Sequence, residues 1–208
     1  MKGLKKNKQQ KSKSTDSKLK ENIYLLAIII FVYLIYFISL KNDFIINWDD
    51  HLYVTENDMI KDFSWKGIKT IFSTFHYENY HPLTNLSNAI EYRFFGLNPL
   101  PYHLFNLFLH LLNVGLVFRL MKLFSRRKEI AIISSLFFGI HPMHVESVAR
   151  ISERKDLLYA CFYLLSLIYY LQYIQKKKHI TLYYALFSSF YPVYQSLPPL
   201  PCLFYYCW

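Results

Sequence analysis

Two long uncharged runs of apolar residues constrain the fold of this chain more than any other feature. Residues 23–40 and residues 157–174 each contain 18 residues without a charged side chain. A helix of this length reaches about 27 Å, close to the roughly 30 Å hydrocarbon core of a bilayer. With 53% hydrophobic residues, the chain is neither an ordinary water-soluble globule nor a disordered polymer. We therefore predict an all-α membrane protein, folded as a multi-span helical bundle.

Basic clusters alternate along the chain with acidic or neutral segments. Residues 1–22 carry eight lysines against two acidic residues, and residues 119–129 and 175–179 are also basic. Residues 41–100 are net acidic, and residues 143–156 are neutral. Since short cytoplasmic segments carry an excess of Lys and Arg, this alternation predicts a cytoplasmic N-terminus. A nucleic-acid-binding arm is the alternative for residues 1–22, but the adjoining apolar run favours a tail at a lipid surface and no nucleic-acid partner.

The same alternation places the predicted membrane spans. They lie at about 23–40, 101–119, 130–142 and 157–174, with a fifth starting near residue 180. We assign residues 1–22 to a basic cytoplasmic tail and residues 23–190 to the multi-span membrane domain. Residues 191–208 are expected to form an aberrant Pro-rich apolar tail, because prolines such as Pro192 interrupt helical hydrogen bonding.

The long loop after the first span contains two segments in which apolar residues recur at helical spacing. In residues 64–75 these are Trp65, Ile68, Ile71, Phe72 and Phe75. In residues 84–96, one side carries Leu86, Ala89, Ile90 and Phe94. We expect two amphipathic helices that lie along the membrane surface, the second ending at Gly96.

A polar stripe interrupts the second predicted span. It consists of His103, Asn106, His110 and Asn113, whose 3-4-3 spacing puts all four on one helix face. Polar groups in hydrocarbon need partners, so this face should contact other helices or a water-filled cavity. Hydrogen bonds between helices are favoured over ligand contact, although both interpretations stay open.

Two short segments in the outer loop carry candidate functional residues. Asp49 and Asp50 follow Trp48, and adjacent carboxylates suit a proton acceptor or a divalent-cation site. An exposed acidic loop is the alternative for this pair. The second segment runs from Tyr80 to Thr84 and includes His81; we predict Thr84 as the N-cap of the following helix.

Residues 141–156 form a third candidate segment, between the third and fourth predicted spans. His141, His144 and Glu146 could be a metal cluster, but their spacing matches no standard zinc motif. Arg150 and Arg154 are four residues apart, so we expect them on one helix face, where two guanidinium groups could clamp a phosphate. A helix cap with surface ion pairs is the alternative.

Three motifs, taken together and in this order, resemble a known family. They read WDDHLYVTEN, YHPLTNLSNAIEYRFFGLNPLPYHLFNLFLHLLN and FFGIHPMHVESVARISERKDLL. They resemble the amino-terminal membrane half of the transmembrane and tetratricopeptide-repeat proteins, which are similar to protein O-mannosyltransferases and share the glycosyltransferase-C architecture. The resemblance covers roughly residues 20–190.

The resemblance implies transfer of a sugar from a polyprenyl or dolichyl phosphate to a protein hydroxyl, at the outer face of the membrane. It implies that Asp49 and Asp50 are the catalytic pair. The residues implied for the donor phosphate are Arg150, Arg154 and Lys155. The supporting residues in the same motifs are His81, His141, His144, Glu146, Glu153 and Asp156. No cofactor or metal ligand is predicted, except that a divalent cation at the acidic pair stays open.

The resemblance ends near Phe190, where the family continues with further spans and helical repeats. We therefore expect a truncated and inactive amino-terminal part of such a transferase. It would be a multi-pass protein, of the bacterial inner membrane rather than the endoplasmic reticulum. A non-catalytic scaffold or a degenerate remnant is the alternative, and a transporter is a weaker one.

Overall fold

The computed structural model describes residues 2–45, 49–76 and 79–196. Within these ranges the regular secondary structure is helical, apart from an isolated β-bridge between His76 and Asn79. The longer helices are α1 (Lys2–Tyr36), α5 (Pro99–Ser125), α6 (Lys128–Ile140), α8 (Arg154–Lys176) and α9 (His179–Ser196). The shorter elements are η1 (Phe37–Lys41), η2 (His51–Thr55), α2 (Asp58–Lys61), α3 (Trp65–Ser73), α4 (Pro82–Phe95) and α7 (His144–Ala149). The prediction of an all-α membrane protein is confirmed.

Three helical segments in the described part of the chain are long and apolar enough to cross a membrane. They are Leu19–Lys41, Pro99–Ser125 and Arg154–Lys176, and they contain the first, second and fourth predicted spans. The third predicted span corresponds to α6, whose 13 residues reach only about 20 Å. The fifth corresponds to α9, in which several tyrosines and serines dilute the aliphatic residues.

Two predicted segment boundaries do not appear as breaks in the helices. Helix α1 is continuous from Lys2 to Tyr36, so the predicted boundary at residue 22 lies inside it. The Lys and Gln residues before this point are good helix formers, which favours an uninterrupted helix. Helix α9 passes the predicted boundary at residue 190 and includes Pro192. A proline removes one backbone hydrogen bond and can bend a helix without ending it.

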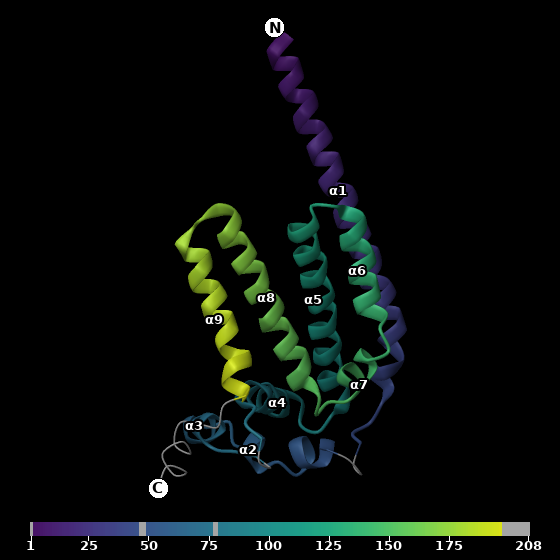
Figure 1. The fold of residues 1–208 in the computed structure, drawn as a ribbon. Helices are drawn as coiled ribbons and strands as arrows, with labels where there is room; N and C mark the ends of the chain where they lie inside the picture. The colour runs from purple at the N-terminus through teal and green to yellow at the C-terminus, as the bar shows by residue number, and fades with distance from the viewer. Residues whose placement is uncertain (1, 46–48, 77–78, 197–208) are drawn as a thin grey trace.

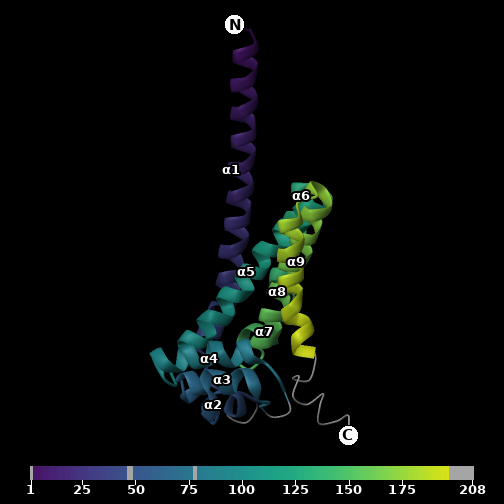
Figure 2. The ribbon, with the colours of Figure 1, turned by 90° about the vertical axis from the view of Figure 1, so that its left-hand side faces the viewer.

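The two ends of the bundle differ in charge and in structure. The α5–α6 and α8–α9 connections lie at the same end as the N-terminal part of α1, and α2, α3, α4 and α7 lie at the other end (Figures 1 and 2). Arg126 and Lys177, both with positive φ, cap α5 and α8 at the first end. Their cations lie where the helix dipoles favour positive charge. The basic segments that the sequence assigns to one side of the membrane thus share one end of the bundle.

Helix α5 is the central helix, because it packs against α1, α6 and α8. Val32 of α1 and Val114 of α5 are fully buried in the core between these helices. Gly139 of α6 lies against both valines, and this close approach requires a residue without a side chain. A second core lies in the layer of short helices and includes Val54, Ile60, Ile71, Tyr102 and Ile151.

The two amphipathic helices predicted in the first loop are confirmed as α3 and α4. Ser64 caps α3 by accepting a hydrogen bond from the Gly67 N–H at 3.1 Å. The predicted cap of α4 is wrong, because the helix begins at Pro82 and Thr84 lies inside its first turn. Proline favours the first helical position, since its fixed φ is helical and its missing N–H is not needed there. Gly96, with φ of 60°, follows the end of α4 as predicted.

We predict that Gly139→Ala destabilises the fold and that Gly115→Ala, the matched control in α5, does not. A β-carbon at Gly139 would lie 2.6 Å from Val32 Cγ2, whereas one at Gly115 meets no atom within 4 Å. Overpacking costs about 1–3 kcal/mol, and an unhindered Gly→Ala change in a helix gains up to about 1 kcal/mol. The thermal midpoints of the purified variants measure this difference. Equal midpoints would contradict the packing of α1 against α6.

Candidate functional site

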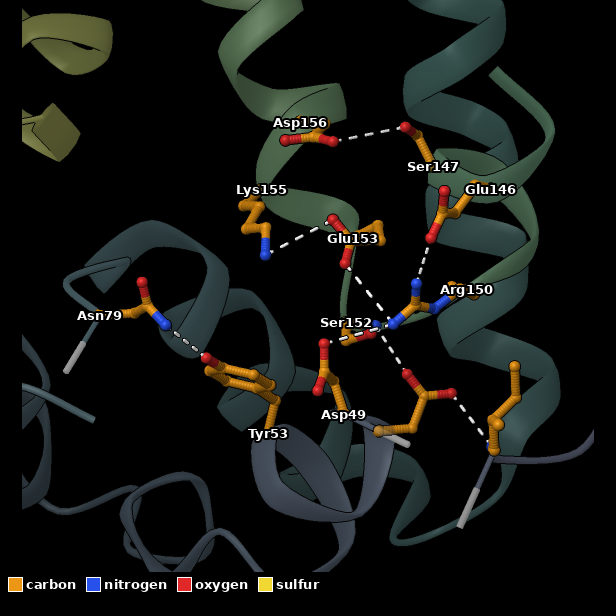
Figure 3. A network of polar contacts seen from close by, with 12 residues as sticks. Asp49, Tyr53, Asn79, Glu146, Ser147, Arg150, Ser152, Glu153, Lys155 and Asp156 are labelled. Carbon is orange, nitrogen blue, oxygen red and sulfur yellow. Dashed lines mark hydrogen bonds and ion pairs between the residues drawn. The ribbon is translucent and has the colours of Figure 1, made fainter. Parts of the chain in front are cut away.

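The candidate site lies at the end of the bundle that carries the short helices (Figure 3). Two segments meet there: the acidic pair, which is helical and leads directly into η2, and the non-helical residues 150–153 between α7 and α8. Ile151 and Ser152 are buried, which holds the second segment against the bundle. The structure therefore brings together the first and third predicted motifs, about a hundred residues apart in the chain. Trp48 lies outside the described residues.

Asp50 is buried and bonds to two backbone amides. Its Oδ2 accepts a hydrogen bond from the Ile45 N–H at 3.1 Å, and its Oδ1 accepts one from the Ser152 N–H at 2.9 Å. The residue is only 1% exposed. Both carboxylate oxygens are thus occupied in joining two loop segments, and neither faces an open surface.

Asp49 has a different environment, although it is the neighbouring residue. Its side chain is 40% exposed, and its Oδ2 lies 3.3 Å from a terminal nitrogen of Arg150. An accessible carboxylate with a fixed cationic partner can accept a proton or orient a polar ligand. The structure therefore distinguishes the two members of the acidic pair, which the sequence does not.

Arg150 lies at the centre of a group of carboxylates (Figure 3). Its guanidinium forms ion pairs with Asp49, with Glu146 one helical turn earlier, and with Glu153 at 3.6 Å. Lys155 is 3.4 Å from the other oxygen of Glu153. The Asp156 carboxylate accepts a hydrogen bond from the Ser147 hydroxyl at 3.5 Å.

Arg154 is completely buried and faces the inside of the bundle. Its Nε donates to Asn106 Oδ1 at 2.8 Å, and a terminal nitrogen donates to the carbonyl oxygen of Tyr102 at 3.0 Å. The other terminal nitrogen contacts three acceptors in α4, which are Ser87, Asn88 and Glu91 at 2.6–2.9 Å. The guanidinium lies 4.9 Å from the ring centre of Phe105. Arg154 thus joins α4, α5 and α8, and presents no surface to a ligand.

The expectation that Arg150 and Arg154 share one helix face is wrong. Arg150 follows the end of α7, and Arg154 is the first residue of α8. Between them, the Arg150 carbonyl accepts a hydrogen bond from the Asn106 amide at 2.8 Å, and the Ser152 N–H bonds to Asp50. Side chains therefore satisfy the backbone groups that a continuous helix would have paired, and the two arginines point to different surroundings.

The buried face of α4 is polar, which the apolar periodicity of residues 84–96 did not predict. Asn88 and Glu91 are buried, whereas Ile90 and Phe94 are 41% and 73% exposed. Burial raises the pKa of Glu91, although the neighbouring Arg154 favours its charged form. The polar side of α4 turns inward because the buried cation of Arg154 requires acceptors.

Three of the four residues in the polar stripe of α5 form hydrogen bonds to other segments of the bundle, in line with the favoured interpretation. Asn106 bonds to the Arg150 carbonyl, His110 to the Gly139 carbonyl at 3.0 Å, and Asn113 to the Leu157 carbonyl at 2.9 Å. Gly139 lies at the C-terminal end of α6, where carbonyls lack a partner within the helix. His103 is also buried.

The predicted histidines lie in two separate places. His81 precedes α4, and burial together with the positive charge of Lys155 lowers its pKa to about 4. The ring centroids of His141 and His144 are 6.0 Å apart. The ring of His144 packs on that of Phe138, with 4.4 Å between the ring centroids. Within the described ranges, no three His, Cys, Asp or Glu side chains are grouped closely enough to hold a metal ion.

An open groove lies beside Arg150, between α7 and Ile45. It has a volume of about 470 Å³, and its lining is mainly apolar, with one acidic and one basic side chain. Its lining residues are Ile45, Pro142, Val145, Glu146, Ala149 and Arg150. The Asp49–Arg150 ion pair (the acid–arginine pair below) therefore borders a space that can receive a ligand with both apolar and charged parts.

We predict that Arg154→Leu strongly destabilises the protein and that Arg154→Leu/Glu91→Leu restores part of the loss. The single change leaves the Glu91 carboxylate buried without its cation, which costs about 3–5 kcal/mol. Unfolding midpoints of the purified variants test this, with Arg93→Leu, an exposed arginine of α4, as the control. A double variant no more stable than the single one would contradict the pairing.

We also predict that His81 makes the protein less stable in acid. Its folded-state pKa of about 4 lies below the ordinary 6.5, so between these values the unfolded chain binds a proton that the folded chain excludes. Stability from this group is present above pH 6.5 and is lost as the pH falls toward 4. The thermal midpoint of His81→Gln should therefore fall less between pH 7 and pH 4. Parallel curves for the two proteins would contradict the burial of the imidazole.

Comparison with known proteins finds similarity to protein O-mannosyl-transferases. The chain is 33% identical over 148 residues to Protein O-mannosyl-transferase tmtc2 of Xenopus laevis, which covers 67% of this chain and 17% of that protein. It is 34% identical over 94 residues to human TMTC3, covering 45% of this chain and 10% of the relative. It is 34% identical over 92 residues to Drosophila melanogaster Tmtc1, covering 44% and 11%. No family model matches the chain, and no solved structure matches it.

These relatives confirm the resemblance that the three motifs indicated. The chain spans less than a fifth of the length of these curated relatives. All three are animal proteins, so they give no support to a bacterial inner membrane, and that expectation stays a prediction.

Proposed function

We propose that this chain forms part of a membrane glycosyltransferase of the glycosyltransferase-C type. It would move a sugar from a polyprenyl or dolichyl phosphate to a hydroxyl group of a protein, and the names of its relatives favour mannose. The observation that carries the proposal is the acid–arginine pair, which stands beside an open groove in the motif that resembles the family's catalytic segment.

Asp49 is the proposed proton acceptor. The acceptor oxygen would form a bond to the anomeric carbon, while the bond from that carbon to the phosphate oxygen breaks. The phosphate leaves with the electron pair, and the hydroxyl proton moves to the Asp49 carboxylate. The exposure of Asp49 supports this role. The two backbone amides on Asp50 suit a residue that holds the site together.

Arg150 and Lys155 are the proposed partners of the donor phosphate. Negative charge grows on the leaving phosphate in the transition state, and fixed cations near it lower the barrier. Arg150 lines the groove, and Lys155 is bound to the same glutamate, Glu153. Arg154 is buried and bonded to the bundle interior, so its proposed role changes from phosphate binding to holding this segment in place.

The sequence led us to expect that the 208 residues alone are inactive, whereas the assembled acid–arginine pair beside the groove supports the opposite proposal, that they carry out the transfer. The experiment compares Asp49→Asn with Asp50→Asn in the 208-residue chain, reconstituted in lipid vesicles. The assay measures transfer of mannose from a polyprenyl-phosphate donor to a Ser/Thr peptide. Because Asn cannot accept the proton, Asp49→Asn should lower turnover by about 10²–10⁴-fold without a change in thermal midpoint. Asp50→Asn should lower the midpoint, since an amide offers one acceptor oxygen where two are used.

The matched control is Asp58→Asn, an exposed acid of the same layer that pairs with Lys61. It should leave both turnover and midpoint unchanged. Normal turnover of Asp49→Asn would show that Asp49 is not the proton acceptor. No turnover by the parent chain would contradict the proposed activity of this chain.

A further inference from the structure

Asn106 occupies a special position in the contacts around residues 150–154. It lies in the N-terminal third of α5, near the site end of the bundle, and is fully buried. Its amide nitrogen donates to the Arg150 carbonyl, and its amide oxygen accepts from Arg154 Nε, both at 2.8 Å. One side chain therefore holds both ends of the turn between α7 and α8.

The side chains of the turn are also held, by the burial of Ile151 and by the other hydrogen bonds of Arg154, but its backbone groups at Arg150 and Ser152 are bound by two side chains from elsewhere. Its midpoint is held by Asp50, which accepts the Ser152 N–H. Asp50 and Asn106 come from different segments, so together they attach the turn at its centre and at its two ends. Arg150 carries the guanidinium that contacts Asp49, and its own carbonyl is the group that Asn106 holds. A movement of this carbonyl would move the base of that side chain.

An amide suits this position for a chemical reason. The site requires a donor for a carbonyl oxygen and an acceptor for a guanidinium N–H within one buried side chain. Asn supplies both, whereas an ionised Asp supplies only acceptors and Leu supplies neither. Unmade hydrogen bonds are costly here, because the side chain is excluded from the surface.

Asn113 is a natural comparison on the same face of α5. It is also fully buried, and its amide donates to the carbonyl of Leu157 at 2.9 Å. Leu157 lies within the first turn of α8, beyond the segment that carries Arg150. Asn113 therefore joins α5 to α8 as Asn106 does, but it does not contact the turn.

We infer that Asn106 is a positioning residue, which sets the geometry of the acid–arginine pair by holding the Arg150 carbonyl. That Asn106 holds the Arg150 carbonyl follows from the hydrogen bonds alone. Its importance for catalysis rests on the proposed function.

The test measures geometry and activity separately, in the full 208-residue chain in lipid nanodiscs. Spin labels are attached at Ile45→Cys and Val145→Cys, two exposed positions that line the groove with Arg150, after Cys161, Cys202 and Cys207 are replaced by Ser. Dipolar EPR then reports the distribution of distances across the groove. The variants are Asn106→Asp, which keeps the acceptor and loses the donor, Asn106→Leu, and the control Asn113→Leu.

We expect one narrow distance distribution for the parent and for Asn113→Leu, and a broader or shifted one for both Asn106 variants. A merely structural role would lower the thermal midpoints of Asn106→Leu and Asn113→Leu alike and would not separate their distributions. Parent-like distributions in the Asn106 variants would overturn the inference. Equal broadening in Asn113→Leu would overturn it as well.

The activity arm uses the transfer assay with unlabelled protein. Asn106→Asp should lower kcat by about 100-fold with little change in KM, because misplacement of reacting groups by about 1 Å has an effect of this size. Unchanged kcat in an active parent would overturn the catalytic part of the inference. No turnover in the parent, with the expected EPR result, would contradict the proposed function and leave the positioning role standing.

Discussion

The buried guanidinium of Arg154 is the interaction on which the site end of the molecule depends. A buried cation is tolerated only when a counter-ion and enough acceptors surround it. Here the counter-ion is Glu91 of α4, and further acceptors come from α4 and α5. The short helix α4 is therefore fixed to the bundle by charge and hydrogen bonds as much as by apolar contact. Phe44 and Val54, on either side of the acidic pair in the chain, belong to the core of this same layer.

Burial separates residues that look equivalent in the sequence. Asp49 and Asp50 are neighbours, yet one is 40% exposed and the other 1% exposed. Arg150 and Arg154 are one helical turn apart in spacing, yet one borders a groove and the other lies inside the bundle. In each pair the more deeply buried member is bonded into the interior. The other reaches the surface, since Asp49 is 40% exposed and Arg150, although only 13% exposed, lines the groove. Asp49 and Arg150 are also the two that contact each other.

The sequence predicts those features that depend on local pattern. Long uncharged runs identified the helices that can cross a membrane, and the 3-4-3 spacing from His103 to Asn113 identified the face of α5 that binds other helices. The buried contacts of the polar face of α4 were not predicted, because the apolar periodicity describes the apolar face and says nothing of the partners that the polar face meets. Glu91 turns inward because it pairs with Arg154, which is 63 positions away in the sequence. A local residue pattern cannot predict a contact of such long sequence separation. The non-helical turn at 150–153 was missed for the same reason, since its acceptors and donors come from Asp50 and Asn106.

The location of the site follows from the arrangement of charge along the bundle. The basic connections after α5 and after α8 lie at one end, with the N-terminal part of α1 (Figure 1). The acid–arginine pair lies at the other end, among the short helices (Figure 3). If the basic end faces the cytoplasm, as the distribution of Lys and Arg predicts, the groove opens toward the opposite face of the membrane. The groove has an apolar lining with one arginine and one glutamate, and the apolar part and the arginine are the features on which the proposed lipid-phosphate donor rests.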